Sequence, residues 1–303
     1  MKRKLFKYLL ILLSLIVLSE IGLRIFLDNA ARVLYQKDAA CEYRLVPNQN
    51  ISRFHNEYQT NSYGMRSGEI RSGQKKRILF FGDSVLNGGS KIDQADLLTQ
   101  IVEEKLNSFY NVEIGTCNIS ANSWGPENAF RYLQTYIDFD FDLIVLVFNS
   151  HDFHDNMHFK EVVGKEPAWP DSQPYLAITD FLSGYFVPKI ESVFGSNYDY
   201  LEGFDDSQTN PGWKLFIDYA RANNKELLFY HHPDANELKN GTYTKDGQLL
   251  EAFMIQDSVK VIDGLDHEIQ ENFIDNIHLN KKGHAKIADV IFDEIKMKNL
   301  LAL

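Results

Sequence analysis

Clustered basic residues are scarce in this chain, and their scarcity excludes one class of partner. The 303 residues include 31 Lys and Arg against 42 Asp and Glu, which gives a formal net charge of -11. Nucleic-acid binding needs Lys and Arg gathered on one face to neutralise phosphates. No such stripe follows the first few residues, so we expect no nucleic-acid partner, and a neutral or sugar-like substrate fits the charge better.

Cysteine is also rare, since Cys41 and Cys117 are the only two. An oxidising compartment would permit a disulfide between them, and two unpaired buried thiols are an equal alternative. Neither lies in a context typical of a nucleophile or a metal ligand. The sequence also lacks internal repeats and low-complexity tracts, and its hydrophobic content of 44% suffices for one full core with appendages.

The clearest targeting signal lies at the N-terminus. Four basic residues among the first seven precede an apolar run over residues 8–18, and apolar character resumes over 21–26. The run is short for a membrane span, which takes about 20 residues, and suits a signal peptide, but no convincing A-x-A cleavage site follows. Glu20 and Arg24 are spaced to pair across one helical turn. We therefore expect residues 1–27 to be a retained membrane anchor, with a cleaved signal peptide as the alternative.

The basic cluster also predicts the topology. Because positive residues stay on the cytoplasmic side, a single pass would leave the domain that follows on the extracytoplasmic side of the cytoplasmic membrane. Residues 28–75 are polar and are broken by Pro47, Gly64, Gly68 and Gly73. This composition predicts a juxtamembrane stalk whose short extended pieces pack on the edge of the domain.

Residues 76–303 alternate between strand-like and helix-like segments. Apolar runs of the kind found inside parallel sheets alternate with helical periodicity and helix-start signals. The expected strands are 77–81, 112–119, 142–148, 226–230 and 259–262, and the expected helices are 95–109, 126–138, 213–223, 248–255 and 281–298. This order predicts a three-layer α/β fold with about five parallel strands and right-handed crossovers.

A long insertion, residues 153–212, interrupts the alternation after the third strand. It is too long for an ordinary connection between a strand and a helix. Eleven aromatic residues between Phe153 and Phe204, among them Tyr185, Phe186, Tyr198 and Tyr200, argue against a disordered loop. The insertion could form a lid or wall of the substrate cleft, or a packed subdomain without substrate contact.

Two short motifs near opposite ends of this domain carry the chemistry. Gly82-Asp83-Ser84 follows the first strand, at the sheet edge where such folds bind ligands, although alone it also fits a simple turn or helix cap. Asp275 and His278 lie just before the last helix, whose expected N-cap is Asn280. A carboxylate that accepts from one imidazole nitrogen leaves the other free to take a serine proton. Ser84, His278 and Asp275 are therefore a candidate catalytic triad.

With these motifs the chain resembles the SGNH (GDSL-type) hydrolase family, in a membrane-anchored form. The matching residues are Gly82-Asp83-Ser84, Asp275-x-x-His278 with the residues trailing to His284, and Gly125 after the second strand. The segment from Asn61 to Arg66 is also similar to membrane-tethered members. The resemblance covers about residues 76–298 without the insertion. It implies a flavodoxin-like fold, serine esterase chemistry that needs no cofactor, and an oxyanion hole with the backbone N–H groups of Ser84 and Gly125.

One block departs from the family pattern. The family has G-x-N-D after the third strand, with the Asn side chain as third oxyanion donor, whereas residues 149–152 here are Asn-Ser-His-Asp. His151 therefore occupies the Asn position, and we favour its ring N–H as the donor. The alternatives are Asn149, reaching in through a shifted turn, and no third donor.

A metal-dependent phosphoesterase is a rival interpretation. Residue types that bind metals gather at His151, Asp152, His154, Asp155 and His158, and again at His231, His232 and Asp234. The D-x-H and G-D-x-x-D elements of a binuclear phosphoesterase are missing upstream. We therefore expect no metal, and serine chemistry instead.

The sequence thus predicts an esterase that forms an acyl-enzyme on Ser84. Water would release the acyl group, while a sugar hydroxyl would make the same intermediate a step in O-acyl transfer. The location and the resemblance suggest O-acyl groups of cell-envelope or secreted glycans as substrate. An inactive scaffold is a further alternative, which turnover of an activated ester would distinguish.

Overall fold

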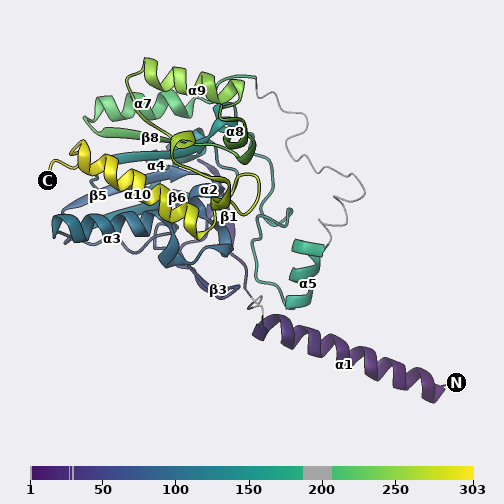
Figure 1. Ribbon diagram of the computed structural model, residues 1–303. Helices are drawn as coiled ribbons and strands as arrows, with labels where there is room; N and C mark the ends of the chain where they lie inside the picture. The colour runs from purple at the N-terminus through teal and green to yellow at the C-terminus, as the bar shows by residue number, and fades with distance from the viewer. Residues whose placement is uncertain (1, 27, 29–30, 187–206) are drawn as a thin grey trace.

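A five-stranded parallel sheet forms the centre of the molecule (Figure 1). The computed structural model describes residues 2–26, 28, 31–186 and 207–303. The strands are β5 (Lys76–Gly82), β6 (Ile114–Ser120), β7 (Leu143–Asn149), β8 (Glu226–His232) and β9 (Lys260–Asp263), in the order β6-β5-β7-β8-β9. Every neighbouring pair is parallel. The prediction of about five parallel strands is confirmed.

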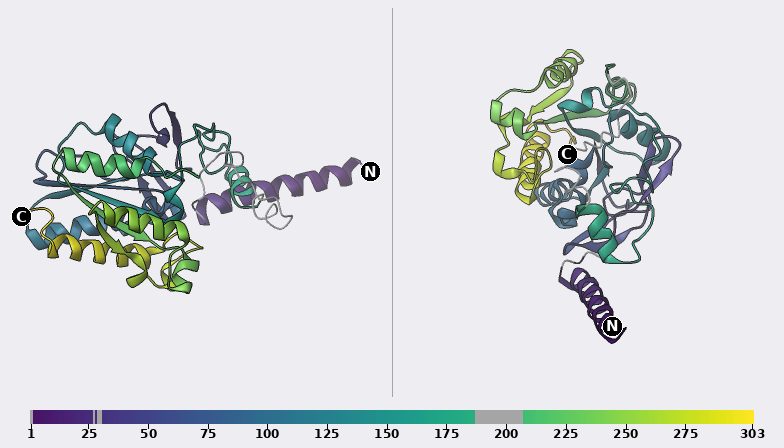
Figure 2. Two further views of the ribbon diagram at one scale, coloured as in Figure 1. Left: turned by 90° about the horizontal axis from the view of Figure 1, so that it is seen from above. Right: turned by 90° about the vertical axis from the view of Figure 1, so that its right-hand side faces the viewer.

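Helices cover both faces of this sheet (Figures 1 and 2). They are α2 (Ser84–Asn87), α3 (Leu98–Tyr110), α4 (Pro126–Tyr136), α7 (Gly212–Ala222), α8 (Ala235–Asn240), α9 (Lys245–Gln256) and α10 (Lys281–Met297). Successive residues of β5 point to opposite faces, so Ile78 and Phe80 pack with α3 and α10, while Leu79 and Phe81 pack with α4, α7 and α9. Burial on both faces explains why the central strand β7 is apolar at all but its last position. The three-layer α/β fold is confirmed.

The segment between the N-terminal helix and the sheet is integral to the domain core. It forms two antiparallel hairpins, β1 (Tyr35–Asp38) with β2 (Glu42–Leu45), and β3 (Asn50–Arg53) with β4 (Asn56–Gln59). Tyr43 and Tyr58 are 5% and 1% exposed and belong to the same hydrophobic cluster as Trp124. The short extended pieces expected in this stretch are present, but a stalk is not an apt description, because their apolar side chains complete the core of the domain.

The N-terminal helix α1 (Lys2–Phe26) projects from the domain (Figures 1 and 2). Its 24 residues Arg3–Phe26 are long and apolar enough to cross a membrane, and none of its most apolar stretch is buried against the rest of the protein. At 1.5 Å per residue this length is about 36 Å, which exceeds a hydrocarbon core of about 30 Å. A signal sequence has the same character, so retention of the helix stays a prediction.

The described part of the insertion packs on the β1–β2 hairpin. The Trp169 ring lies edge-on to Tyr43 at 5.8 Å, and Tyr35 N–H donates to the Pro170 carbonyl over 2.8 Å. The insertion also contains the short helix α5 (Ala177–Phe181) and a following π-helical turn, Leu182–Phe186. Tyr198 and Tyr200 lie outside the described residues, as do the side chains of Tyr185 and Phe186.

Both cysteines are free and buried, so the disulfide alternative is wrong. Burial raises the pKa of Cys117 to about 12 and also raises that of Cys41. Each thiol is a packed, protonated core group.

Candidate active site

Ser84 begins α2 directly after β5, at the carboxyl edge of the sheet. The turn requires glycine at position 82, because a Cβ there would lie 2.6 Å from the Val147 carbonyl oxygen and 2.7 Å from Leu86 Cβ. Asp83 fixes the turn from the other side, since its Oδ1 accepts a 2.8 Å hydrogen bond from Val85 N–H. The Gly-Asp-Ser sequence thus places Ser84 on a tight, rigid turn.

The structure brings His278 and Asp275 to Ser84 across 194 positions of sequence. His278 Nε2 lies 2.9 Å from Ser84 Oγ, and His278 Nδ1 lies 2.9 and 3.0 Å from the two carboxylate oxygens of Asp275. The three side chains therefore form one hydrogen-bonded chain from carboxylate to hydroxyl. This is the geometry that a base with its orienting carboxylate needs to activate a serine.

Backbone donors keep Asp275 ionised. Burial works against the charged carboxylate, but the N–H groups of His278 and Ile277, at 2.8 and 3.0 Å from Oδ1, and the His278 ring outweigh it and lower the pKa of Asp275. Asn280, the expected N-cap, accepts from Lys282 and Gly283 N–H and starts α10 immediately after this turn. The loop that carries the pair is thus fixed at both ends.

A buried ion pair beneath this loop was not foreseen from the sequence. His232 and Glu268 are both 0% exposed, and His232 Nδ1 lies 2.8 Å from Glu268 Oε1. The other ring nitrogen lies 2.8 Å from the Ile277 carbonyl oxygen, next to His278. Burial disfavours a charged ring, but Glu268 and the Ile277 carbonyl outweigh burial and raise the pKa of His232. His232 and Glu268 are 36 positions apart, and no short sequence motif predicts that they pair.

Arg66 supports the other side of the site and was also not singled out as a functional residue. Its guanidinium is fully buried and donates to the carbonyl oxygens of Asn87, Gly89 and Ile92, the last two at 2.7 and 2.6 Å. These carbonyls belong to the end of α2 and to the loop that follows it. The group lies 4.0 Å over the Tyr58 ring, and burial lowers the pKa of Arg66 to about 10. The segment before the sheet therefore braces the nucleophile loop.

The N–H of Gly125, a predicted oxyanion donor, has a hydrogen-bond acceptor within the protein. Gly125 is the N-cap of α4, and its N–H donates to Asn128 Oδ1 over 3.1 Å. A backbone N–H has one hydrogen to give, so this bond competes with any oxyanion. A Cβ at this position would overlap the Asp155 carbonyl, so close packing explains the glycine.

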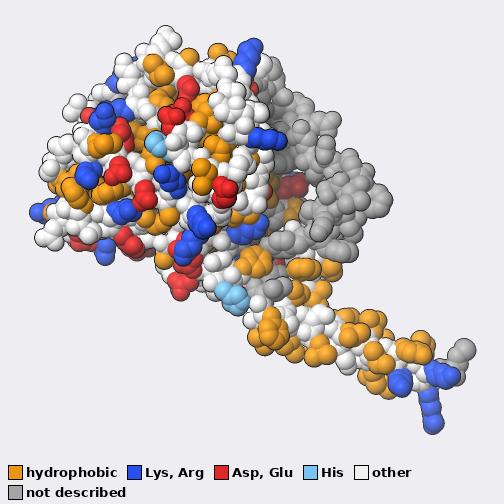
Figure 3. Space-filling model, in the orientation of Figure 1, with side chains coloured by type: hydrophobic (Ala, Val, Ile, Leu, Met, Phe, Trp, Pro, Cys, Tyr) orange, Lys and Arg blue, Asp and Glu red, His pale blue; other side chains and the backbone are white. Residues whose placement is uncertain are grey.

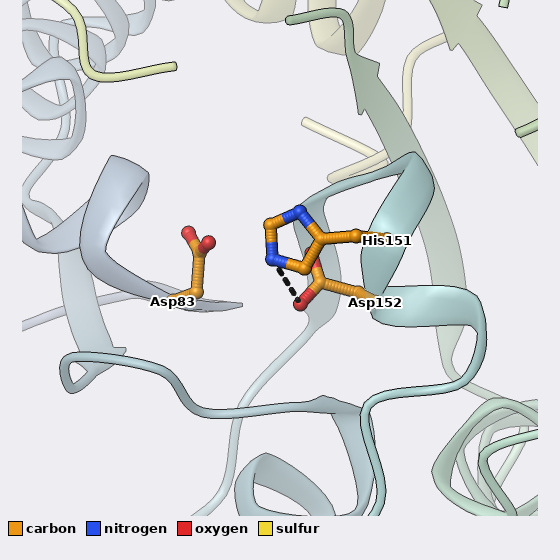
Figure 4. Close-up of side chains that lie close together, drawn as sticks. All are labelled: Asp83, His151 and Asp152. Atoms are coloured by element: carbon orange, nitrogen blue, oxygen red, sulfur yellow. Dashed lines mark ion pairs between the residues drawn. The ribbon is translucent and has the colours of Figure 1, made fainter. Parts of the chain in front are cut away.

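His151 and Asn149 lie beside the Ser84 turn in different ways. Asn149 is 1% exposed, its Nδ2 donates to Asp83 Oδ2 over 3.1 Å, and its Oδ1 accepts from His151 N–H. The side chain of His151 is 58% exposed and its ring faces Asp83 (Figure 4). Asn149 thus links the turn after β5 to the turn after β7 by hydrogen bonds, whereas the His151 ring is accessible from solvent.

A group of candidate metal ligands lies at the same place. Asp83, His151 and Asp152 bring ligand atoms within 4.8 Å of one another (Figure 4). Asp152 is fully buried, and burial together with the neighbouring Asp83 carboxylate raises its pKa well above the usual range. Protonation of Asp152 removes the repulsion between the Asp152 and Asp83 carboxylates, and a bound cation would remove the same repulsion.

The other residues of the rival metal hypothesis do not join this group. His154 Nε2 lies 3.7 Å from Asp246, His231 stacks on the Tyr243 ring at 3.7 Å, and His232 pairs with Glu268. His231 and His232 are also buried.

A cavity of about 260 Å³ lies alongside the nucleophile loop. Its lining includes Asn87, Gly89 and Ser90 from that loop, Asn122 from the loop after β6, and Ala168 from the insertion. Ser84, His278 and Asp275 do not line it. The described part of the insertion therefore forms one wall of a cavity next to the site.

Comparison with known proteins gives similarity in structure only. No family model and no curated protein matches the sequence. Similar solved structures include a lipase/acylhydrolase from Enterococcus faecalis, 14% identical, which covers 74% of this chain and 96% of that chain with a TM-score of 0.42. A carbohydrate acetylesterase family member from Sinorhizobium meliloti is 15% identical, covers 75% and 100%, and has a TM-score of 0.40. The esterase EstA from Pseudoalteromonas sp. is 14% identical, covers 74% and 98%, and has a TM-score of 0.44.

Fold and site together define the class without these neighbours. The chain is an α/β protein with a hydrogen-bonded Ser-His-Asp chain at the carboxyl edge of a parallel sheet. Similarity at this level identifies no substrate, so the chemistry proposed below rests on the geometry of the site.

Proposed function

We propose that the protein is a membrane-anchored serine esterase that hydrolyses acyl esters through Ser84, His278 and Asp275. The observation that carries this proposal is the chain of hydrogen bonds from Asp275 through His278 to Ser84 Oγ, each about 2.9 Å long. A cap or turn serine has no need of a histidine oriented by a carboxylate.

In this mechanism His278 Nε2 takes the proton of Ser84 Oγ as that oxygen attacks the ester carbonyl. Asp275 accepts from Nδ1–H and stabilises the imidazolium. The tetrahedral intermediate collapses when His278 returns the proton to the departing alcohol, which leaves an acyl group on Ser84. A water molecule, deprotonated by His278, then releases the acid and restores the serine.

The oxyanion is assigned to the N–H of Ser84 and the ring N–H of His151. Gly125 is left out because its N–H is bonded to Asn128. Asn149 is ranked second because one N–H of its amide is bonded to Asp83 and its side chain is buried in the turn. His151 comes from the short turn after β7, and its ring faces Asp83, the residue before Ser84 (Figure 4). Its Nε2 lies 3.7 Å from Asp152 Oδ1, which is longer than a hydrogen bond, so we assign the ring N–H to the charge that develops on the oxyanion.

The substrate class follows from access and location. The side chains of His278 and Asp275 are 42% and 50% exposed, so water reaches the acyl-enzyme, which favours hydrolysis over O-acyl transfer. With α1 as anchor and the domain on the extracytoplasmic side, O-acyl groups on cell-envelope or secreted glycans are within reach. Acyl transfer to a sugar hydroxyl uses the same intermediate and is the second candidate.

Turnover of p-nitrophenyl acetate by the purified full-length protein tests the proposal. Ser84→Ala and His278→Ala should each reduce kcat by several orders of magnitude, because triad members act as a unit. Ser172→Ala, an exposed serine of the insertion, is the matched control and should keep wild-type rates. Wild-type rates in Ser84→Ala would overturn the assignment. A second assay separates hydrolysis from acyl transfer: acetate released from an acetylated glycan indicates hydrolysis, and a new ester on an added deacetylated glycan indicates transfer.

A further inference from the structure

The membrane helix and the insertion are joined by hydrogen bonds that neither segment's sequence predicts. Glu20 of α1 accepts from the backbone N–H groups of Ala177 and Ile178, over 2.9 and 3.0 Å. Arg24, paired with Glu20 at 2.6 Å, donates to the Tyr175 carbonyl oxygen over 3.2 Å. The start of α5 is thus fixed against the last turns of α1 (Figures 1 and 2).

This contact determines the depth of α5 relative to a bilayer. Counted from Leu5, a span of about 20 residues ends at Arg24, so Glu20 lies about one turn inside the outer boundary. An ionised carboxylate at that depth is costly unless it is paired. Arg24 and the two N–H groups of α5 provide its partners. Segment 175–182 therefore lies at the level of the outer interface.

The same segment exposes apolar side chains. Tyr175 is 99% exposed, and Leu176 and Leu182 are 44% and 43% exposed. We call these three residues the α5 surface. Figure 3 shows apolar side chains continuing from α1 onto the adjoining part of the domain, while the rest of the visible surface mixes charged and apolar groups. An exposed tyrosine with leucines is the composition found where proteins meet the headgroup region.

We propose that the α5 surface inserts into the outer leaflet of the bilayer that α1 spans, as a second membrane contact. The proposal rests on the proposed anchoring of α1 and is independent of the esterase chemistry. The occupant is lipid because the surface is continuous with the membrane helix. The start of α10, which follows His278, lies on the side of the domain that faces α1 in Figure 1, so a second contact holds the catalytic edge toward the membrane.

Depth-resolved quenching in vesicles tests the proposal. The full-length protein is reconstituted in dioleoylphosphatidylcholine vesicles with doxyl lipids, and a thiol-reactive NBD probe is attached to Leu176→Cys or Leu182→Cys. Cys41 and Cys117 are buried and do not compete. Leu12→Cys in α1 is the positive control, and Met297→Cys, 69% exposed at the far end of α10, is the negative one.

Quenching at positions 176 and 182 by shallow doxyl lipid, at least severalfold above position 297, is the expected result. Substitution Glu20→Ala should lower quenching at 176 without changing it at 12. If position 12 is quenched while 176 and 182 match 297, the α5 surface does not contact lipid. A blue-shifted but unquenched probe at 176 would indicate a protein partner instead, and no quenching at position 12 would remove the anchor and the proposal together.

Discussion

His232 donates a 2.8 Å hydrogen bond from Nε2 to the carbonyl oxygen of Ile277, the residue before His278. Its Nδ1 lies the same distance from Glu268, so both ring nitrogens face acceptors. This arrangement favours an N–H on both ring nitrogens, in agreement with the raised pKa of His232. The pair positions the loop that carries Asp275 and His278.

Substitution His232→Gln should lower kcat by up to about 10²-fold with little change in KM, because a small displacement of the base weakens proton transfer. The pKa of His232 is raised above its usual 6.5, so its contribution to stability is fully present below that value and is lost as pH rises through the raised pKa. Measured against pH, the Tm difference between wild type and variant should be largest below pH 6.5 and narrow above it. A difference that does not vary with pH would contradict the ion pair.

We predict that Arg66 stabilises the nucleophile loop through its hydrogen bonds to three carbonyl oxygens and not only through its charge. Arg66→Lys cannot reach all three carbonyls, and a buried acceptor left without a partner costs about 1–3 kcal/mol. Urea unfolding should show a loss in that range, and kcat should fall with it. Arg71→Lys, whose side chain is 60% exposed, is the matched control and should stay within about 0.5 kcal/mol of wild type.

The sheet and the triad could be predicted because their signals are local. Residues 143–148 are apolar at every position, as β7 requires inside the sheet, and Asn280 caps α10 as expected. Short motifs identified Ser84, Asp275 and His278 as partners, and the distances between them agree with that pairing.

What the sequence could not reveal are pairings of buried polar groups. Arg66 and His232 meet their hydrogen-bond partners only when segments far apart in the sequence pack together. The spacing of hydrophobic residues in the sequence does not predict such contacts. Gly125 has the expected sequence position, but the capping bond from Asn128 that engages its N–H depends on side-chain geometry. Segment 28–75 is polar on average, which conceals that Tyr43 and Tyr58 complete the core.

We expect substitutions of His151 to lower kcat and a substitution of Asn149 to lower Tm. If the His151 ring N–H is the second oxyanion donor beside Ser84 N–H, His151→Ala should lower kcat by about 10²–10³ with a much smaller change in KM, and His151→Asn should recover much of the loss. Asn149→Ala removes the buried bond to Asp83, so its main effect should be a lower Tm. A large kcat loss in Asn149→Ala with a near-normal His151→Ala would assign the donor to Asn149. If neither variant loses activity, Ser84 N–H remains as the assigned donor.

Chelation should leave activity unchanged. Asp83, His151 and Asp152 bring candidate ligand atoms together, but burial and the Asp83 carboxylate raise the pKa of Asp152, which works against the charged carboxylate that a divalent ion binds. Esterase rates before and after EDTA treatment measure this directly. Loss of activity that zinc or manganese restores would favour the metal-dependent mechanism.

The most direct test of the central claim is covalent capture of the nucleophile. Full-length protein treated with a fluorophosphonate should gain one phosphonyl group, and peptide mass spectrometry should locate it on Ser84, because the inhibitor reacts with a serine that a nearby base activates. Labelling should disappear in His278→Ala and persist in Ser172→Ala. An unlabelled Ser84 in protein that turns over p-nitrophenyl acetate, or a phosphonyl group on another residue, would contradict the account.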